Sequence, residues 1–365
     1  MAPAAPLPVT LLDLPNAVLA KILALFADGS RMFGRDRDGN HVFGFAPVRG
    51  ISNIAAAGRT CSQLAQIVDD PEVYVYMVYD AGQLLASQGG DLGALLGLLS
   101  RPRFRNLRVL KLRGLNRVST KLVNGVRYRK ALPDPGWSRL QRLSLHDCGV
   151  LATTRHILSL LPPSLRSFAV GHGSSGGRWL STAMLHELAN RCPSIEALNL
   201  GWTKAAEPWR SILEVVALRF PRLVALNIAY AGYLEAGFSN HALDACLAQV
   251  KKLKRLRILQ AEYLGLDGSD SHFTGGERRA ETTAIEAVIA ELPDLAYISL
   301  AAISPAHDYA GNHAIATAFA QRIGAKHPGL VVQGGRDAVR VYSSVWRSLL
   351  EGWNAAHADQ DCDAW

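Results

Sequence analysis

One pattern, Leu-x-x-Leu-x-Leu with other apolar residues allowed at the leucine positions, recurs along this chain in a single phase. Seven copies begin at Leu107, Leu140, Leu165, Ile195, Leu223, Leu256 and Leu295. The starts are 33, 25, 30, 28, 33 and 39 residues apart, and a weak eighth copy begins at Leu330. Periods of this length are typical of solenoids, in which each repeat buries its apolar face against its neighbours.

The intervals between copies contain stretches with the apolar periodicity of an amphipathic helix. The clearest are residues 181–191, 208–219, 240–251, 281–291 and 313–326. Four of them run into a proline at Pro193, Pro221, Pro293 or Pro328, which cannot continue a helix and disfavours helix in the residue before it. The predicted unit is therefore a helix, a proline turn, a short strand and a loop.

This unit is similar to the longer, helix-bearing leucine-rich repeat. The resemblance implies an α/β solenoid with parallel strands on the concave face and helices on the convex face. A doubly wound α/β sheet also alternates helix and strand, but it does not require a recurring leucine phase. We predict about seven to eight repeats over residues 81–335, followed by a capping helix and tail over 336–365.

The N-terminal segment carries a different pattern. Leu14-Pro15 and the apolar stripe Leu19, Ile22 and Leu23 indicate a helix with proline in its first turn. A second block contains Arg59-x-Cys61 and closes with Asp70-Pro71-x-x-Tyr74. Together the blocks resemble the F-box, a small all-α module, over residues 8–80. A glycine-rich insertion over 28–50 separates them and is expected to be a loop.

The F-box resemblance implies a function. In that family the module docks on a Skp-type adaptor, which joins it to a cullin–RING ubiquitin ligase while the rest of the chain holds a protein substrate. The adaptor-binding residues carried over are Leu14, Pro15, Leu19, Ile22, Leu23 and Pro71. The implied role is substrate recognition in a Skp–cullin–F-box type ligase. The alternative is a stand-alone repeat scaffold that binds protein or nucleic acid.

Alternation along each predicted strand places its polar positions on the concave face. Three successive repeats share an aromatic residue at one position, and stacking would make a ladder beside amide side chains that suits a protein partner. Packing of these aromatics over the loops is an equal alternative. The predicted substrate-binding residues are Lys111, Arg113, His146, Asn199, Trp202, Asn227, Tyr230, Gln260, Glu262 and Tyr263.

Charge is uneven along the chain. The net charge is +8, yet residues 92–133 contain eleven Lys and Arg and no Asp or Glu. The insertion after the first strand contributes a basic patch of Arg117, Lys121, Arg127, Arg129 and Lys130. Arginine binds phosphates and carboxylates bidentately. The patch is therefore equally compatible with binding an acidic or phosphorylated substrate segment and with being a solvated basic loop. Nucleic acid is disfavoured because few aromatic residues accompany the charges.

The remaining motifs point to no enzyme, cofactor or metal. Residues 171–177 satisfy both G-x-G-x-x-G and G-x-S-x-G, but Arg178-Trp179-Leu180 separate them from the next helix, and no geometry fixes a partner for Ser175. The five cysteines lack close metal-ligand spacing and are expected to be reduced thiols. With no signal-peptide pattern and no long apolar run, we expect a cytoplasmic or nuclear protein without a membrane span.

Overall fold

The structure is a computed structural model of the whole chain. It describes residues 32–35, 41–44, 76–80, 99–113, 137–146, 157–171, 180–201, 203–229, 240–261, 285–299 and 321–333. The chain divides into two compact units, Met1–Arg142 and Leu143–Trp365, and each is described by itself. The predicted domain limits at residues 80, 335 and 336 fall on or beside residues outside this description and stay predictions.

The first unit contains an antiparallel hairpin of β1 (Met32–Arg35) and β2 (His41–Gly44), with Phe33 opposite Phe43. The hairpin lies within the 28–50 segment that the sequence analysis expects to be a loop. Two features of the sequence explain the difference. Phenylalanine and valine have high strand propensity, and the connecting sequence contains Asp38-Gly39, a strong hairpin-turn signal.

The first unit also contains the first predicted repeat. Strand β3 (Tyr76–Asp80) pairs in parallel with β4 (Val109–Arg113), and a short 3₁₀ helix, η3 (Pro102–Phe104), precedes β4. The anchor residues Leu107, Leu110 and Leu112 are all buried. Each such leucine removed from water contributes roughly 1.5–3 kcal/mol, so the apolar phase that defines the repeat is also what stabilises it.

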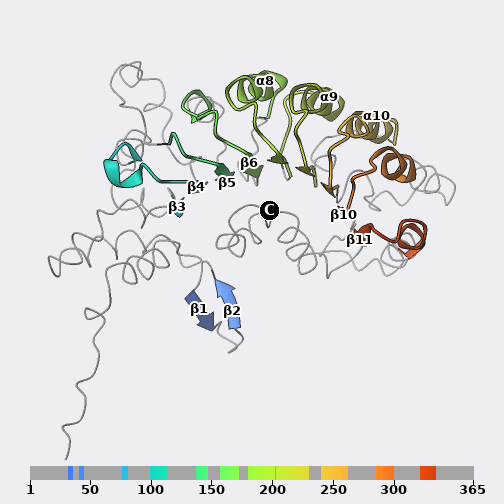
Figure 1. Cartoon of the computed structure of the whole chain (residues 1–365), viewed down its shortest axis with the longest axis horizontal. Helices are drawn as coiled ribbons and strands as arrows, with labels where there is room; N and C mark the ends of the chain where they lie inside the picture. The colour runs from blue at the N-terminus through green and yellow to red at the C-terminus, as the bar shows by residue number, and fades with distance from the viewer. Residues whose placement is uncertain are drawn as a thin grey trace, which may run out of the picture. The chain divides into compact units, whose positions relative to one another are not determined.

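The second unit repeats a helix and a strand. Its strands are β5 (Arg142–His146, whose first residue closes the first unit), β6 (Ser167–Gly171), β7 (Ala197–Asn199), β8 (Ala225–Asn227), β9 (Ile258–Gln260), β10 (Tyr297–Ser299) and β11 (Val331–Gln333), and they neighbour one another in chain order. The pairs from β6 to β11 are parallel. Figure 1 shows the helices side by side along one face of these strands.

The named helices of this unit begin and end close to their predicted limits. They are α8 (Thr182–Arg191), α9 (Trp209–Arg219) and α10 (Asn240–Val250), and residues 285–291 and 321–326 are also helical. Ser181 caps α8, because its Oγ accepts a hydrogen bond from the N–H of Met184 at 3.2 Å. The C-cap residues of α8 and α9 are Cys192 and Phe220, which directly precede the prolines.

One backbone hydrogen bond recurs at every anchor in the described part of the chain. The N–H of the first residue of each copy donates to the carbonyl three residues earlier, at 2.8 to 3.3 Å. The donors are Leu107, Leu140, Leu165, Ile195, Leu223, Leu256, Leu295 and Leu330. Because the same turn forms eight times, the repeat read from the leucine phase is confirmed as a structural unit.

A second recurring feature joins neighbouring repeats. A single carbonyl accepts hydrogen bonds from two consecutive N–H groups of the following repeat, at 2.7 to 3.1 Å. The acceptors in the second unit are Arg166, Glu196, Val224 and Arg257. This arrangement, one parallel strand and one preceding helix per repeat, is the leucine-rich-repeat architecture. It confirms the predicted α/β solenoid class for the described repeats, while the F-box-like residues lie almost entirely outside the description.

Candidate functional site

The predicted polar row of the sheet exists in register. Asn199 pairs with Ala169 on one side and with Asn227 on the other, Asn227 pairs with Gln260, and Gln260 pairs with Ser299. The leucine phase therefore aligns residues about 30 positions apart in the sequence into one line across five parallel strands. The leucine pattern alone predicts this alignment.

The expected exposure of this row is wrong. All three residues of β7, β8 and β10 are buried, and Lys111 of β4 is 5% exposed. Gln260 is half-buried. Both sets of alternating side chains on these strands are therefore buried, as is common in parallel sheets.

The two asparagines of the row bind backbone rather than facing solvent. The Oδ1 atom of Asn199 accepts a hydrogen bond from the N–H of Gly201 at 2.9 Å. The Oδ1 atom of Asn227 accepts one from the N–H of Ala229 at 2.8 Å. Each amide thus holds the first residues after its own strand. In these two repeats the asparagine is a structural residue that fixes the start of the loop.

The loop after β7 is packed closely. Thr203 is fully buried, and its hydroxyl donates to the carbonyl of Val170 at 3.3 Å or to that of Gly201 at 3.2 Å. A Cβ atom on Gly201 would lie 2.9 Å from Oδ1 of Asn227. The loop therefore joins three successive repeats through side chains that the leucine pattern does not mark.

Several predicted site residues cannot be placed. The aromatic ladder of Trp202, Tyr230 and Tyr263, together with Glu262, lies outside the described residues. Arg113 and His146 end β4 and β5, and their side chains are likewise not described. The adaptor-binding residues and the basic patch also lie outside. These residues are Leu14, Pro15, Leu19, Ile22, Leu23, Pro71, Arg117, Lys121, Arg127, Arg129 and Lys130.

The described cysteines of the second unit are buried thiols. Neither Cys192 nor Cys246 forms a disulfide, and both are fully buried. Burial raises the pKa of the Cys192 thiol to about 12, against a smaller opposing effect of the neighbouring Arg191. Its Sγ lies 3.3 Å from the carbonyl of Pro162. A thiol held neutral in this way packs as an apolar group and is a poor nucleophile.

Within the described ranges, no cluster of three or more His, Cys, Asp or Glu side chains could hold a metal ion. The G-x-G-x-x-G segment lies beyond those ranges except for Gly171, the last residue of β6. No described helix is long and apolar enough to cross a bilayer.

Exposed cations gather where helices end and strands begin. Arg222 and Arg255 occupy equivalent positions, each directly before an anchor leucine, and both are exposed. The uneven charge predicted from the sequence was confined to residues 92–133. The signal for this second concentration was present as Lys251-Lys252-Leu253-Lys254-Arg255-Leu256-Arg257. The cations of separate turns lie at the same end of the sheet only because the strands are parallel.

No protein-family model matches the chain, and no curated protein matches it. Among solved structures it is similar to the leucine-rich repeat-containing protein LegL7 from Legionella pneumophila. The identity is 13%, the match covers 70% of this chain and 92% of that chain, and the TM-score is 0.33.

Proposed function

We propose that this chain is a binding scaffold for proteins, and that it serves as the substrate-recognition subunit of a Skp–cullin–F-box type ubiquitin ligase. The observation that carries the scaffold role is the turn that recurs at the six anchors of the second unit, from Leu165 to Leu330, because similar repeats stacked side by side form an extended surface. Solenoids of this kind present such surfaces to partners. The ligase role depends on the F-box resemblance of residues 8–80.

In this proposal the chain itself performs no bond chemistry. Its N-terminal module holds the Skp-type adaptor through Leu14, Pro15, Leu19, Ile22, Leu23 and Pro71. The repeats hold the substrate, which raises its effective concentration at the ubiquitin-loaded enzyme. The buried Asn199 and Asn227 support the loops of the repeats, whereas Trp202, Tyr230 and Tyr263 stay candidates for substrate contact.

The test is co-purification of the full chain with a Skp-type adaptor. The Leu14→Ala/Pro15→Ala variant is compared with wild type, after circular dichroism shows that both are folded. A matched control is Leu218→Ala/Pro221→Ala, because both residues are exposed and lie in the second unit. We expect wild type and control to retain the adaptor and the N-terminal variant to lose it.

Two results would count against the ligase role. If wild type does not bind the adaptor at micromolar concentration, a stand-alone repeat scaffold becomes the better account. If the N-terminal variant binds as well as wild type, the adaptor contact lies elsewhere in the chain and the F-box resemblance has no functional meaning. Binding of a protein partner by the repeats is measured separately from either outcome.

A further inference from the structure

The parallel topology of the second unit collects every helix-to-strand turn at one edge of the sheet. Each helix precedes its strand, so the C-terminal ends of the helices and the first residues of the strands lie together. At the turns that lead into β8 and β9, this edge carries exposed or half-exposed cations. We name as the basic edge the residues Arg219, Arg222, Lys252, Arg255 and Arg257.

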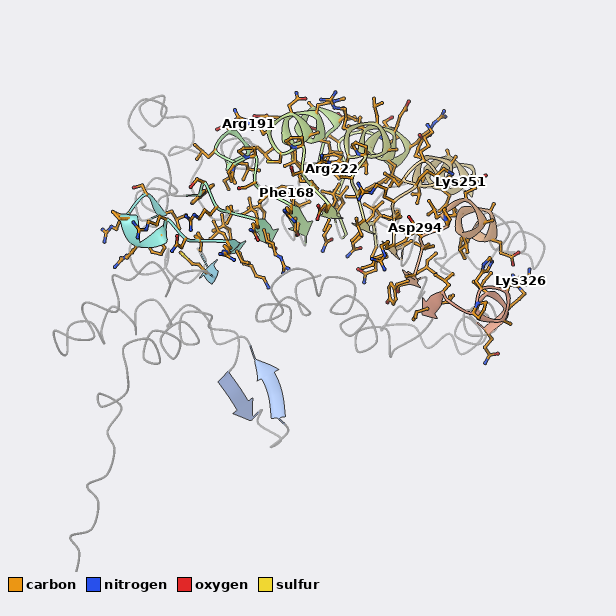
Figure 2. The ribbon with its side chains drawn as sticks, viewed as in Figure 1. Phe168, Arg191, Arg222, Lys251, Asp294 and Lys326 are labelled. Atoms are coloured by element: carbon orange, nitrogen blue, oxygen red, sulfur yellow. The ribbon has the colours of Figure 1, made fainter. Side chains whose placement is uncertain are left out.

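The two turns are in direct contact. The carbonyl of Val224 accepts hydrogen bonds from the N–H groups of Arg257 at 2.8 Å and Ile258 at 3.1 Å. Adjacent strands are about 5 Å apart, so equivalent residues of the two turns are neighbours. Arg222 and Arg255 are one such pair of equivalents. Figure 2 shows Arg191, Arg222 and Lys251 following one another along the repeats.

A second pair of equivalent cations lies at the helix ends. Arg219 directly precedes the buried Phe220, and Lys252 directly precedes the buried Leu253. Each makes a hydrogen bond to a neutral amide, Arg219 to Oδ1 of Asn190 and Lys252 to Oε1 of Gln249. Neutral acceptors position these side chains without cancelling their charge.

Carboxylates enter at the next turn of the solenoid, where the exposed Asp294 occupies the position equivalent to Arg222 and Arg255, directly before the anchor Leu295. Lys254 forms an ion pair with Glu291 at 2.8 Å, and Lys251 also helps to lower the pKa of Glu291. Within the described part of the chain, no ion pair involves Arg222, Arg255 or Arg257. Like charges on adjacent strands repel one another, which destabilises the folded chain. Binding an anion at this edge would offset that repulsion.

The neighbouring surface indicates which anion. Leu218 is 72% exposed and directly precedes Arg219 on α9. A single exposed leucine is ordinary on its own, but one that adjoins Arg219 in the chain offers an apolar contact that a sugar–phosphate backbone would not use. The only aromatic residue in the two turns is the buried Phe220, so base stacking has no platform there. Arginine side chains bind carboxylates through two parallel hydrogen bonds.

We propose that the basic edge binds an acidic segment of a partner protein, with glutamate or aspartate carboxylates on Arg222, Arg255 and Arg257 and an apolar side chain on Leu218. This inference rests on the proposed scaffold function and names the chemistry of the partner. It moves the predicted contact from the buried polar row of the sheet to the edge where the helices end.

The probe is a fluorescein-labelled peptide of repeating Glu-Glu-Leu-Glu, titrated with the full chain and followed by fluorescence anisotropy. We expect saturable binding that Arg222→Glu/Arg255→Glu weakens about tenfold or more, the loss of about two charge-assisted hydrogen bonds. The matched control is Lys204→Glu/Arg210→Glu, which has the same change in charge. Lys204 precedes α9 and Arg210 lies in its first turn, so both are at the opposite end of this helix from the basic edge. Binding should change less than about twofold in this control.

Further variants separate specific from diffuse attraction. Leu218→Ser, or replacement of leucine by serine in the peptide, should each weaken binding severalfold. If the reversal variant is poorly folded by circular dichroism, Arg222→Gln/Arg255→Gln takes its place. The proposal is overturned if the peptide does not bind, if both charge-reversal variants lower affinity equally, or if a single-stranded RNA of the same charge binds more tightly than the peptide.

The outcomes separate this inference from the proposed function. If the adaptor co-purifies but the peptide fails to bind, the basic edge has been misassigned and the ligase role is untouched. If the peptide binds at the basic edge but the adaptor does not co-purify, the inference stands on a scaffold that has no ligase role.

Discussion

The side chain of Asn227 leaves no room for a Cβ atom on Gly201, one repeat earlier. A Cβ atom placed there would be 2.9 Å from Oδ1 and 3.2 Å from both Cγ and Nδ2 of Asn227. The Oδ1 atom is at the same time the acceptor for the N–H of Ala229 at 2.8 Å. The close approach therefore couples the loop after β7 to the loop after β8.

Gly201→Ala should destabilise the chain. The added methyl group must displace the Asn227 amide, which weakens its hydrogen bond to Ala229, and overpacking of this kind costs about 1–3 kcal/mol. We expect the midpoint of urea unfolding to fall with an unchanged slope, measured by circular dichroism. Gly329→Ala is the control, since nothing lies within 4 Å of its added Cβ atom. Equal midpoints for wild type and Gly201→Ala would show that Asn227 can move freely.

Asn199→Ala and Asn227→Ala should each lower stability on their own. Each removes a buried oxygen that accepts a backbone hydrogen bond, from Gly201 or Ala229 respectively. Leaving such an N–H unsatisfied costs about 1–3 kcal/mol. The measurement is again urea unfolding. A loss confined to peptide binding, with stability unchanged, would instead return these residues to the solvent-facing role predicted from the sequence.

The repeat could be predicted because it depends on short-range rules. The helix predicted over 181–191 is observed as Thr182–Arg191, and that predicted over 240–251 as Asn240–Val250. Apolar periodicity, the capping Ser181 and the following prolines are all local signals, so they fix these limits. The weak eighth copy shows where the rule fails. Leu330 makes the common turn, but Tyr297 pairs with Val331, one residue out of phase.

The candidate site could be predicted only in part, because burial and proximity are properties of the assembled sheet. Strand alternation placed Asn199 and Asn227 in one row, yet an amide bonds equally well to water or to backbone, and its sequence position does not decide between them. The basic edge was missed for a related reason. Arg222 and Arg255 are 33 residues apart, and the two turns become neighbours only when β8 and β9 pair.

Glu207 should stabilise the N-terminus of α8 from the following repeat. Its Oε2 atom accepts a hydrogen bond from the N–H of Thr182 at 3.0 Å, next to the Ser181 cap. A carboxylate at this end of a helix also interacts favourably with the helix dipole. Glu207→Gln should lower the free energy of unfolding less than Glu207→Ala does. Ser181→Ala should lower it by about 1 kcal/mol. Thermal unfolding of the three variants checks this order, and a Glu207→Ala variant as stable as wild type would contradict it.

Cys192 should resist alkylation in the folded chain. Its thiol is fully buried, and burial raises its pKa to about 12, so almost no thiolate exists near neutral pH. Iodoacetamide treatment followed by peptide mass spectrometry should label Cys192 only after urea is added. Labelling of Cys192 at the same rate with and without urea would show that the turn opens readily.

The same thiol predicts a loss of stability at alkaline pH. The folded-state pKa lies above the ordinary thiol value of 9.0, so the stability that the buried neutral thiol contributes is fully present below pH 9.0. Between that pH and about 12 the unfolded chain releases the proton while the folded chain keeps it, and stability falls as pH rises. Urea unfolding near neutral and near pH 10 should show a smaller alkaline loss for Cys192→Ala than for wild type. Equal losses in the two proteins would place the alkaline sensitivity at another group.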